Sequence, residues 1–183
     1  MPSYKQILKS SLILIITGYL AACATNTTNK SMTDSGSMME IYEVHHEGRI
    51  YVFYDKKLHD EFLSVGETPF RLTRIGSGPN GETLVFGLTK KDKKMKSSIP
   101  VIELYDGKIE QDSVYAEMRK HDRIYVFNSF KDMGTVRSFG HPNYMYTQIG
   151  AGPKGETVVF VLNKHNKKKR PDALIAEYKK HNS

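Results

Sequence analysis

The sequence of 183 residues contains one cysteine, Cys23, so no disulfide can form within the chain. The apolar run from Leu12 to Leu20 is too short to cross a bilayer, because a membrane helix needs about 20 apolar residues. No G-x-S-x-G nucleophile elbow occurs, and His46-Glu47 begins the zinc-protease pattern H-E-x-x-H but meets Ile50 at its fifth position. The common acyl-transfer and zinc-protease arrangements therefore find no support.

The N-terminal segment combines a basic flank, Lys5 and Lys9, with the short apolar run and small residues after it, which is typical of a signal segment. It resembles a bacterial lipoprotein signal peptide, in which Leu20-Ala21-Ala22-Cys23 is the lipobox. The resemblance implies cleavage between Ala22 and Cys23, a diacylglyceryl group on the Cys23 thiol, and an acyl chain such as palmitate on the new N-terminus. A retained anchor or a buried helix is the alternative.

The residue after the lipobox cysteine is Ala24, not the aspartate that favours inner-membrane retention in this family. The resemblance therefore implies attachment to the outer membrane, facing the periplasm. Two or three acyl chains anchor a protein durably, whereas a single chain is marginal. Residues 24–38 carry no aliphatic or aromatic side chain beyond alanine and methionine, so we predict a flexible tether of about 20 Å root-mean-square length.

The formal charge of the chain is +7, and loss of residues 1–22 would remove two lysines and no acid, leaving +5. The 161 residues that remain suffice for one domain with a core or for two small ones. Nucleic acid is an improbable partner for an exported chain, despite this basic charge.

The rest of the chain is a duplication. A shift of 74 residues places Arg49 to Phe53 on Arg123 to Phe127, and Ile75 to Thr83 on Ile149 to Thr157, without a gap. From Ile41 to Lys108, 24 of 68 positions are identical. We therefore divide the chain into a signal peptide (1–22), a lipidated cysteine and tether (23–38), repeat unit 1 (39–108) and repeat unit 2 (109–183).

Each repeat unit shows the same order of local patterns. In unit 1, residues 39–46 and 49–54 predict a hairpin around Glu47-Gly48, residues 55–66 a short helix, and residues 70–75 and 83–88 a second hairpin. In unit 2, Ser129 is the expected helix cap and Gly140 its end. Apolar segments at 99–105 and 171–178 close the units, the second with helical spacing.

These patterns predict an α+β fold built from two ββαββ(α) repeats. Ile50 to Phe53 and Leu84 to Phe86 do not alternate with polar residues, which indicates strands buried on both faces. We therefore expect the repeats to pack as one pseudo-symmetric body of antiparallel strands. Two independent units are the alternative.

Two segments, Gly76 to Gly81 and Gly150 to Gly155, match the dinucleotide fingerprint G-x-G-x-x-G. That fingerprint needs a helix directly after the glycines to receive the pyrophosphate, whereas strand-like Glu-Thr-Leu-Val-Phe and Glu-Thr-Val-Val-Phe follow here. We predict hairpin turns whose glycines supply backbone geometry: Gly76, Gly78, Gly81, Gly150, Gly152 and Gly155. Contact of the two loops with a ligand or partner is the alternative.

A basic run recurs in both units and is either a solvated surface or a contact for an anionic partner, such as lipid headgroups, lipopolysaccharide phosphates or an acidic protein. If a twofold axis relates the repeats, both runs could face one partner. The candidate contacts are Lys90, Lys91, Lys93, Lys94, Lys164, Lys167, Lys168 and Arg170.

No metal site or catalytic set is predicted. None of the seven histidines falls on a histidine under the shift, and His45-His46 offers at most weak metal binding. The acids recur only at Glu43/Glu117, Glu82/Glu156 and Glu103/Glu177, for which structural hydrogen bonding or solvation is the default. The shift also pairs unlike residues at Arg71/Met145 and His59/Met133, which hints that one unit kept a function and the other became scaffold, although drift is the simpler explanation.

The sequence therefore predicts a non-catalytic, lipid-anchored envelope protein whose duplicated body is a periplasmic binding or interaction module, without a cofactor. Its repeated segments resemble small tandem-repeat lipoproteins, a resemblance that implies no functional residues. The alternative is a carrier or sensor for a lipid or small molecule, with an apolar cavity between the repeats lined by Phe53, Phe86, Phe127 and Phe160. An enzyme is the third hypothesis.

Overall fold

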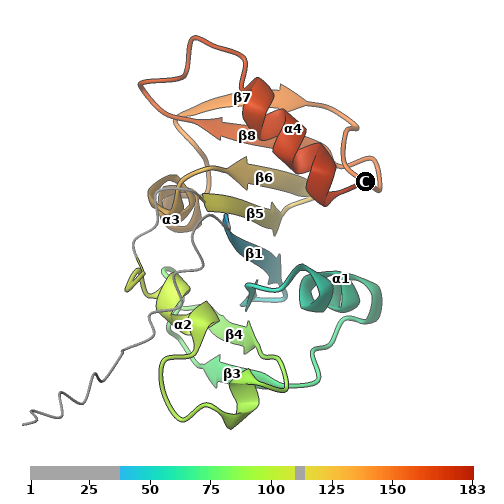
Figure 1. Cartoon of the computed structure of the whole chain (residues 1–183). Coiled ribbons are helices and arrows are strands. Elements are labelled where there is room, and N and C mark those ends of the chain that lie inside the picture. Colours follow the sequence, from blue (N-terminus) through green and yellow to red (C-terminus); the bar gives the residue numbers. More distant parts are fainter. Residues whose placement is uncertain (1–37, 110–113) are drawn as a thin grey trace, which may run out of the picture. The chain divides into compact units, whose positions relative to one another are not determined.

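A computed structural model describes residues 38–109 and 114–183 (Figure 1). One eight-stranded sheet runs through this body, in the order β3-β4-β2-β1-β5-β6-β8-β7. Its elements are β1 (Met39–His46), β2 (Arg49–Phe53), α1 (Lys56–Val65), β3 (Arg71–Arg74), β4 (Thr83–Gly87), the 3-10 turn η1 (Asp92–Lys94), α2 (Pro100–Tyr105), β5 (Val114–Lys120), β6 (Arg123–Phe127), α3 (Phe130–Phe139), β7 (Tyr144–Gln148), β8 (Thr157–Leu162) and α4 (Asp172–His181).

Local signals in the sequence set the ends of these elements. The Asp55 side chain accepts a hydrogen bond from Leu58 N at 3.0 Å and caps α1, and Gly66 ends the helix with a left-handed φ of 82°. Ser129 caps α3 in the same way, through Asp132 N at 3.2 Å. The predicted hairpins and helices of both units are thereby confirmed.

The expectation of an antiparallel body is wrong, because the sheet is mixed. β1 and β2 pair antiparallel, but β1 and β5 pair parallel, as do β2 with β4 and β6 with β8. After β2 the chain passes through α1, returns as β3 at the sheet edge, and places β4 between β3 and β2. This order buries the apolar strands β2 and β4 and leaves the shorter, more polar β3 outside.

Residues related by the 74-residue shift point to opposite faces of the sheet. Ile41 and Ile50 belong to one apolar core, and their equivalents Tyr115 and Ile124 belong to the other. The parallel β1–β5 register pairs Ile41 with Ala116, one residue beyond its equivalent. Because side chains alternate along a strand, this offset exchanges the faces. A pseudo-twofold axis therefore runs along the strands between β1 and β5.

Each face is covered by one helix from each repeat. α1 and α4 contribute Phe62, Leu174 and Tyr178 to the core that holds Tyr42 and Phe53; we call this side the α1/α4 face. α2 and α3 cover the opposite side, the α2/α3 face, through residues that share a core with Ile41 and Val52: Val101, Leu104, Met133 and Val136. The repeats are thus halves of one body, not independent units.

Candidate functional site

The two buried glutamates at the centre of the sheet are the clearest polar feature of the body. Glu43 on β1 and Glu117 on β5 are repeat equivalents, and both are 0 % exposed. Glu43 points to the α2/α3 face and Glu117 to the α1/α4 face, as their register partners Met118 and Tyr42 indicate. Burying a carboxylate costs free energy unless the group is paired, and the two glutamates are paired differently.

Glu43 has a complete ion pair. The guanidinium of Arg137 on α3 donates to it from Nε, at 3.0 Å to Oε1 and 3.2 Å to Oε2, and also from Nη2. Arg137 in turn lies over the ring of Tyr105, 4.3 Å from its centroid. Burial would raise the pKa of Glu43, but the charge and hydrogen bonds of Arg137 outweigh it and hold the pKa below its ordinary value. Glu43 therefore has a structural role in the core.

Glu117 has no such arginine, because the equivalent of Arg137 is Leu63. Its Oε1 accepts hydrogen bonds from the Tyr115 hydroxyl and from Asn182 Nδ2, the latter at 2.6 Å. Its Oε2 is buried and has no hydrogen-bond partner in the described part of the chain. This buried oxygen therefore lacks a protein partner among the described residues, the situation in which an ordered water is the usual substitute.

Two aromatic stacks surround Glu117. Tyr42 stacks on His59 of α1 at 4.8 Å, and Tyr115 stacks on His181 of α4 at 4.1 Å, between ring centroids. Burial raises the pKa of Tyr42 and Tyr115, and nearby carboxylates raise it further, so both phenols stay protonated and act as donors. Burial lowers the pKa of His59 to about 4, which keeps this ring neutral.

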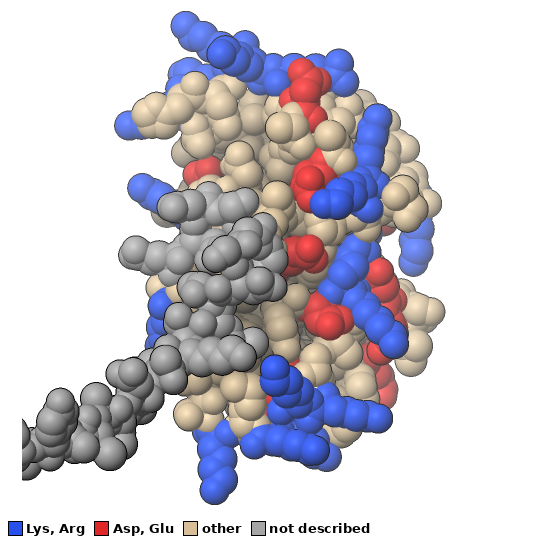
Figure 2. Space-filling model, in the orientation of Figure 1, with Lys and Arg blue, Asp and Glu red and all other residues tan. Residues whose placement is uncertain are grey.

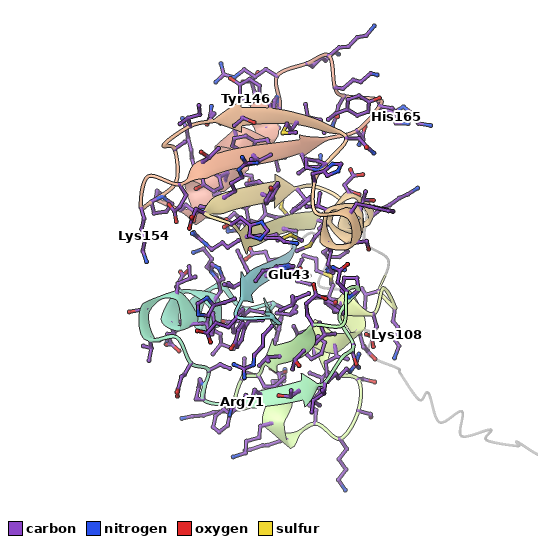
Figure 3. All side chains as sticks on the ribbon, turned by 180° about the vertical axis from the view of Figure 1, so that it is seen from behind. Glu43, Arg71, Lys108, Tyr146, Lys154 and His165 are labelled. Atoms are coloured by element: carbon purple, nitrogen blue, oxygen red, sulfur yellow. The ribbon has the colours of Figure 1, made fainter. Side chains whose placement is uncertain are left out.

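Arg119 extends the cluster toward the surface. It lies two residues after Glu117 on the same face, and its Nη1 donates to Glu156 Oε1 at 2.7 Å. Glu156 also accepts from Lys154 N at 2.7 Å, so it connects the glycine-rich β7–β8 turn to β5. The Nε of Arg119 is buried and unpartnered among the described residues. Figure 3 shows Lys154 projecting from this turn and Glu43 at the centre of the sheet.

A cavity of about 290 Å³ opens beside the cluster, between α1, the β7–β8 turn and the end of α4; we call it the α1/α4 cavity. Lys56 and Asp60, joined at 2.7 Å, form its rim on α1. Its lining residues are Lys56, Asp60, Leu63, Arg119, Pro153, Lys154, Glu156, His181, Asn182 and Ser183. The lining therefore carries side chains of both charges together with apolar surface.

Unpartnered polar atoms gather on this face. Five buried side-chain atoms have no hydrogen-bond partner in the described ranges, and four of them belong to the α1/α4 face: His59 Nε2, Glu117 Oε2, Arg119 Nε and the Tyr178 hydroxyl. Buried polar atoms are almost always satisfied by protein, water or ligand. Of the four residues, Arg119 lines the α1/α4 cavity, and we take this cavity together with the buried cluster on the same face as the candidate site.

The pseudo-equivalent place on the α2/α3 face is mostly apolar. The shift replaces Tyr115 by Ile41, Tyr42 by Ala116 and His59 by Met133, all of which are fully buried. The polar site thus occurs once, although the repeat occurs twice. The pairing of His59 with Met133 was the one sequence signal that pointed to it. For the two strand glutamates, the sequence indicates only structural hydrogen bonding or solvation. No sequence pattern indicates the role of Asn182.

The glycine-rich segments form hairpin turns that join β3 to β4 and β7 to β8. A Cβ on Gly78 or Gly152 would lie 2.5 Å from the carboxylate of Glu82 or Glu156, which folds back into the loop. Gly76, Gly81, Gly150 and Gly155 have φ between 63° and 83°, where glycine is favoured. Strands follow both turns, so the nucleotide fingerprint is coincidental.

The basic runs lie at opposite ends of the body, beyond β4 and β8, and do not face one partner. Figure 2 shows Lys and Arg gathered at both ends. Lys93 lies over Phe70 at 4.4 Å and Lys167 over Tyr144 at 4.2 Å, a cation–π contact repeated in both units. Arg170 pairs with Asp172 at 3.1 Å. The remaining predicted contacts are exposed: Lys90, Lys91, Lys94, Lys164 and Lys168.

The four phenylalanines proposed to line an apolar cavity are each 0 % exposed. Phe53 and Phe160 belong to the α1/α4 face, whereas Phe86 and Phe127 belong to the α2/α3 face. They do not line a common cavity. Cys23 and Ala22, the predicted lipidation and cleavage sites, lie outside the described residues.

Within residues 38–109 and 114–183, no group of three or more His, Cys, Asp or Glu is placed to hold a metal ion. The helices of these ranges include none with the length and apolar character to span a membrane. No family model, curated protein or solved structure matches the chain.

Proposed function

We propose that this protein is a non-catalytic, lipid-anchored envelope protein of the outer membrane that faces the periplasm and binds a polar partner in the α1/α4 cavity. The anchor rests on the resemblance of residues 1–23 to a lipoprotein signal and on the position of the lone cysteine within the lipobox. The polar segment 24–38 then separates the body from the bilayer.

The single observation that carries the binding role is the α1/α4 cavity itself, which is lined by charged side chains that include Arg119, whose Nε has no partner among the described residues. The rim offers cationic and anionic side chains, Lys154 and Lys56 on one hand and Asp60 on the other. A polar segment of another envelope protein suits such a rim better than an apolar lipid does. A partner in the cavity would form hydrogen bonds with its polar lining residues or replace waters that they order.

Catalysis is less well supported by the same groups. The His59 ring is fully buried with a pKa of about 4, so it is a poor base at neutral pH. The phenols of Tyr42 and Tyr115 have pKa values raised by burial and therefore do not ionise to nucleophiles. These groups are suited to donating hydrogen bonds and to stacking.

The anchor is tested by the Cys23→Ser variant expressed in a Gram-negative host and labelled with palmitate. We expect wild-type protein to incorporate label and fractionate with the outer membrane, and the variant to remain unlabelled and leave the membrane fraction. Labelling of Cys23→Ser equal to wild type would contradict the anchor and leave the binding role of the body unaffected.

The binding role is tested by placing a photoreactive amino acid at Lys154 in cells. Asn80 occupies the equivalent position in the other repeat and is the matched control. We expect a discrete crosslinked species from position 154 that position 80 does not give. Equal adducts from both positions, or none, would argue against a partner in the α1/α4 cavity.

A further inference from the structure

The two edges of the sheet differ in the protection that they carry. β3 is four residues long and contains Arg71 and Arg74, and Arg74 forms an ion pair at 2.7 Å with Asp106, which directly follows α2. β7 is five residues long and contains no charged side chain. Short, charged edge strands discourage pairing with other chains, and longer uncharged ones permit it. Among the described strands, β7 pairs only with β8.

The side chains of β7 are exposed in a way that suits a further strand. Tyr144 is 38 % exposed and Met145 is 48 % exposed, and they point to opposite faces of the sheet. A cavity of about 290 Å³ lies at the start of the strand and is lined by Pro142, Tyr144, Leu162 and Lys164, among others. A strand added at this edge would find hydrogen-bond partners on β7 and a pocket for one of its side chains.

The basic run of unit 2 is attached to the same edge. Lys167 Nζ donates to the Tyr144 hydroxyl at 3.1 Å, and the guanidinium of Arg170 lies 5.9 Å from the centroid of the Tyr146 ring. Lys164, Lys168 and Lys169 are exposed beside them. Figure 2 shows Lys and Arg side chains gathered at the end of the body where Figure 1 places β7. The edge therefore presents cations alongside its backbone groups.

We propose that β7 is a docking edge for an extended acidic segment of a partner protein, which adds to the sheet as a ninth strand and pairs its carboxylates with the run Lys164 to Arg170. Charge complementarity selects this occupant. A second copy of the chain would bring its own basic run to the same edge, and like charges oppose that pairing. This surface is separate from the α1/α4 cavity and does not depend on it.

The test uses full-length protein and a fluorescent eight-residue probe peptide of alternating valine and glutamate, followed by anisotropy. We expect the Lys164→Glu/Lys168→Glu variant to bind the probe about tenfold more weakly, since two reversed charges remove on the order of 1.4 kcal/mol of attraction. The matched control is Lys90→Glu/Lys94→Glu, which reverses the equivalent lysines of unit 1 and should leave affinity unchanged. Thr147→Glu, which places a carboxylate on β7 that repels those of the probe, should also weaken binding, whereas Thr73→Glu at the same position of β3 should not.

Hydrogen exchange locates the contact. We expect the probe to slow exchange of backbone amides in Tyr144–Gln148 and not in Arg71–Arg74. Equal loss of affinity in both lysine double variants, or absence of protection on β7, would overturn the proposal. Displacement of the probe by micelles of short-chain phosphatidylglycerol would assign the run to lipid headgroups instead, and a dimer that protects β7 without probe would assign the edge to a second copy.

Discussion

The two faces of the sheet give the same glutamate two different environments. On the α2/α3 face, Glu43 is held by Arg137, with His45 Nε2 3.4 Å away, and most of the surrounding positions are apolar. On the α1/α4 face, Glu117 is held by a tyrosine and an asparagine and leaves one oxygen without a partner in the described structure. Equivalent residues of the two repeats thus lie on opposite faces of the sheet. Both carboxylate oxygens of Glu43 are paired, whereas one oxygen of Glu117 has no partner among the described residues.

The difference follows from a few substitutions between equivalent positions. Arg137 corresponds to Leu63, Met133 to His59 and Ile41 to Tyr115. In the first pair, the α2/α3 face has the counter-ion of its glutamate and the α1/α4 face has leucine; in the other two pairs, the α2/α3 face has an apolar residue and the α1/α4 face has a polar aromatic one. Because both environments lie in one sheet, each serves as an internal reference for the other.

The largest expected effect comes from removing the ion pair of the α2/α3 face. Arg137→Leu copies Leu63 and leaves Glu43 buried without its counter-charge, so we expect a loss of about 3–5 kcal/mol in the free energy of unfolding. Urea denaturation monitored by circular dichroism measures it. The double variant Glu43→Gln/Arg137→Leu removes both charges and should lose less than the single variant. A loss below about 1 kcal/mol for Arg137→Leu would show that the pair is not a structural centre.

The next effect concerns pH and the histidine of the α1/α4 face. The folded-state pKa of His59 is about 4, below its ordinary value of about 6.5. Between these pH values His59 binds a proton in the unfolded chain but not in the folded chain. The free energy of unfolding therefore falls as the pH drops through this window. The shift corresponds to about 3 kcal/mol.

His59→Met introduces the residue found at the equivalent position 133. In this variant the free energy of unfolding should depend less on pH between 6.5 and 4.5, while its value at pH 7.5 changes little. Unfolding free energies measured at several pH values for both proteins give the comparison. Below about pH 4.5 the two curves should fall together, because protonation of Glu43, whose folded-state pKa is lowered, also destabilises the fold there. An unchanged slope in the variant would exclude His59 as the source.

Much of the local structure could be predicted from the sequence, because its signals are local. Asp55 and Ser129 cap their helices, Gly66 and Gly140 end them, and the strand patterns agree between repeats. The relative arrangement of the repeats could not be predicted in this way. A shift of 74 residues identifies equivalent residues, but one residue of register between β1 and β5 decides which face each occupies.

The candidate site was missed for the same physical reason. Its contacts join residues far apart in sequence, such as Glu117 with Asn182, and no spacing rule connects them. A glutamate within an apolar strand looks the same at position 43 and at position 117. Only packing separates the one that meets an arginine from the one that meets aromatic rings and a cavity.

The smallest expected effect tests this separation directly, with the same substitution at both positions. Glu117→Gln keeps an oxygen for Tyr115 and Asn182 and removes a carboxylate that has no cationic partner at hydrogen-bond distance among the described residues, so stability should change by about 1 kcal/mol or less. Glu43→Gln leaves the Arg137 guanidinium buried without a carboxylate partner, so the loss in the free energy of unfolding should be several-fold larger. Urea denaturation of the two variants under identical conditions measures the difference. Equal losses would mean that Glu117 contributes as much to the stability of the fold as Glu43 does, and the contrast between the two faces would not hold.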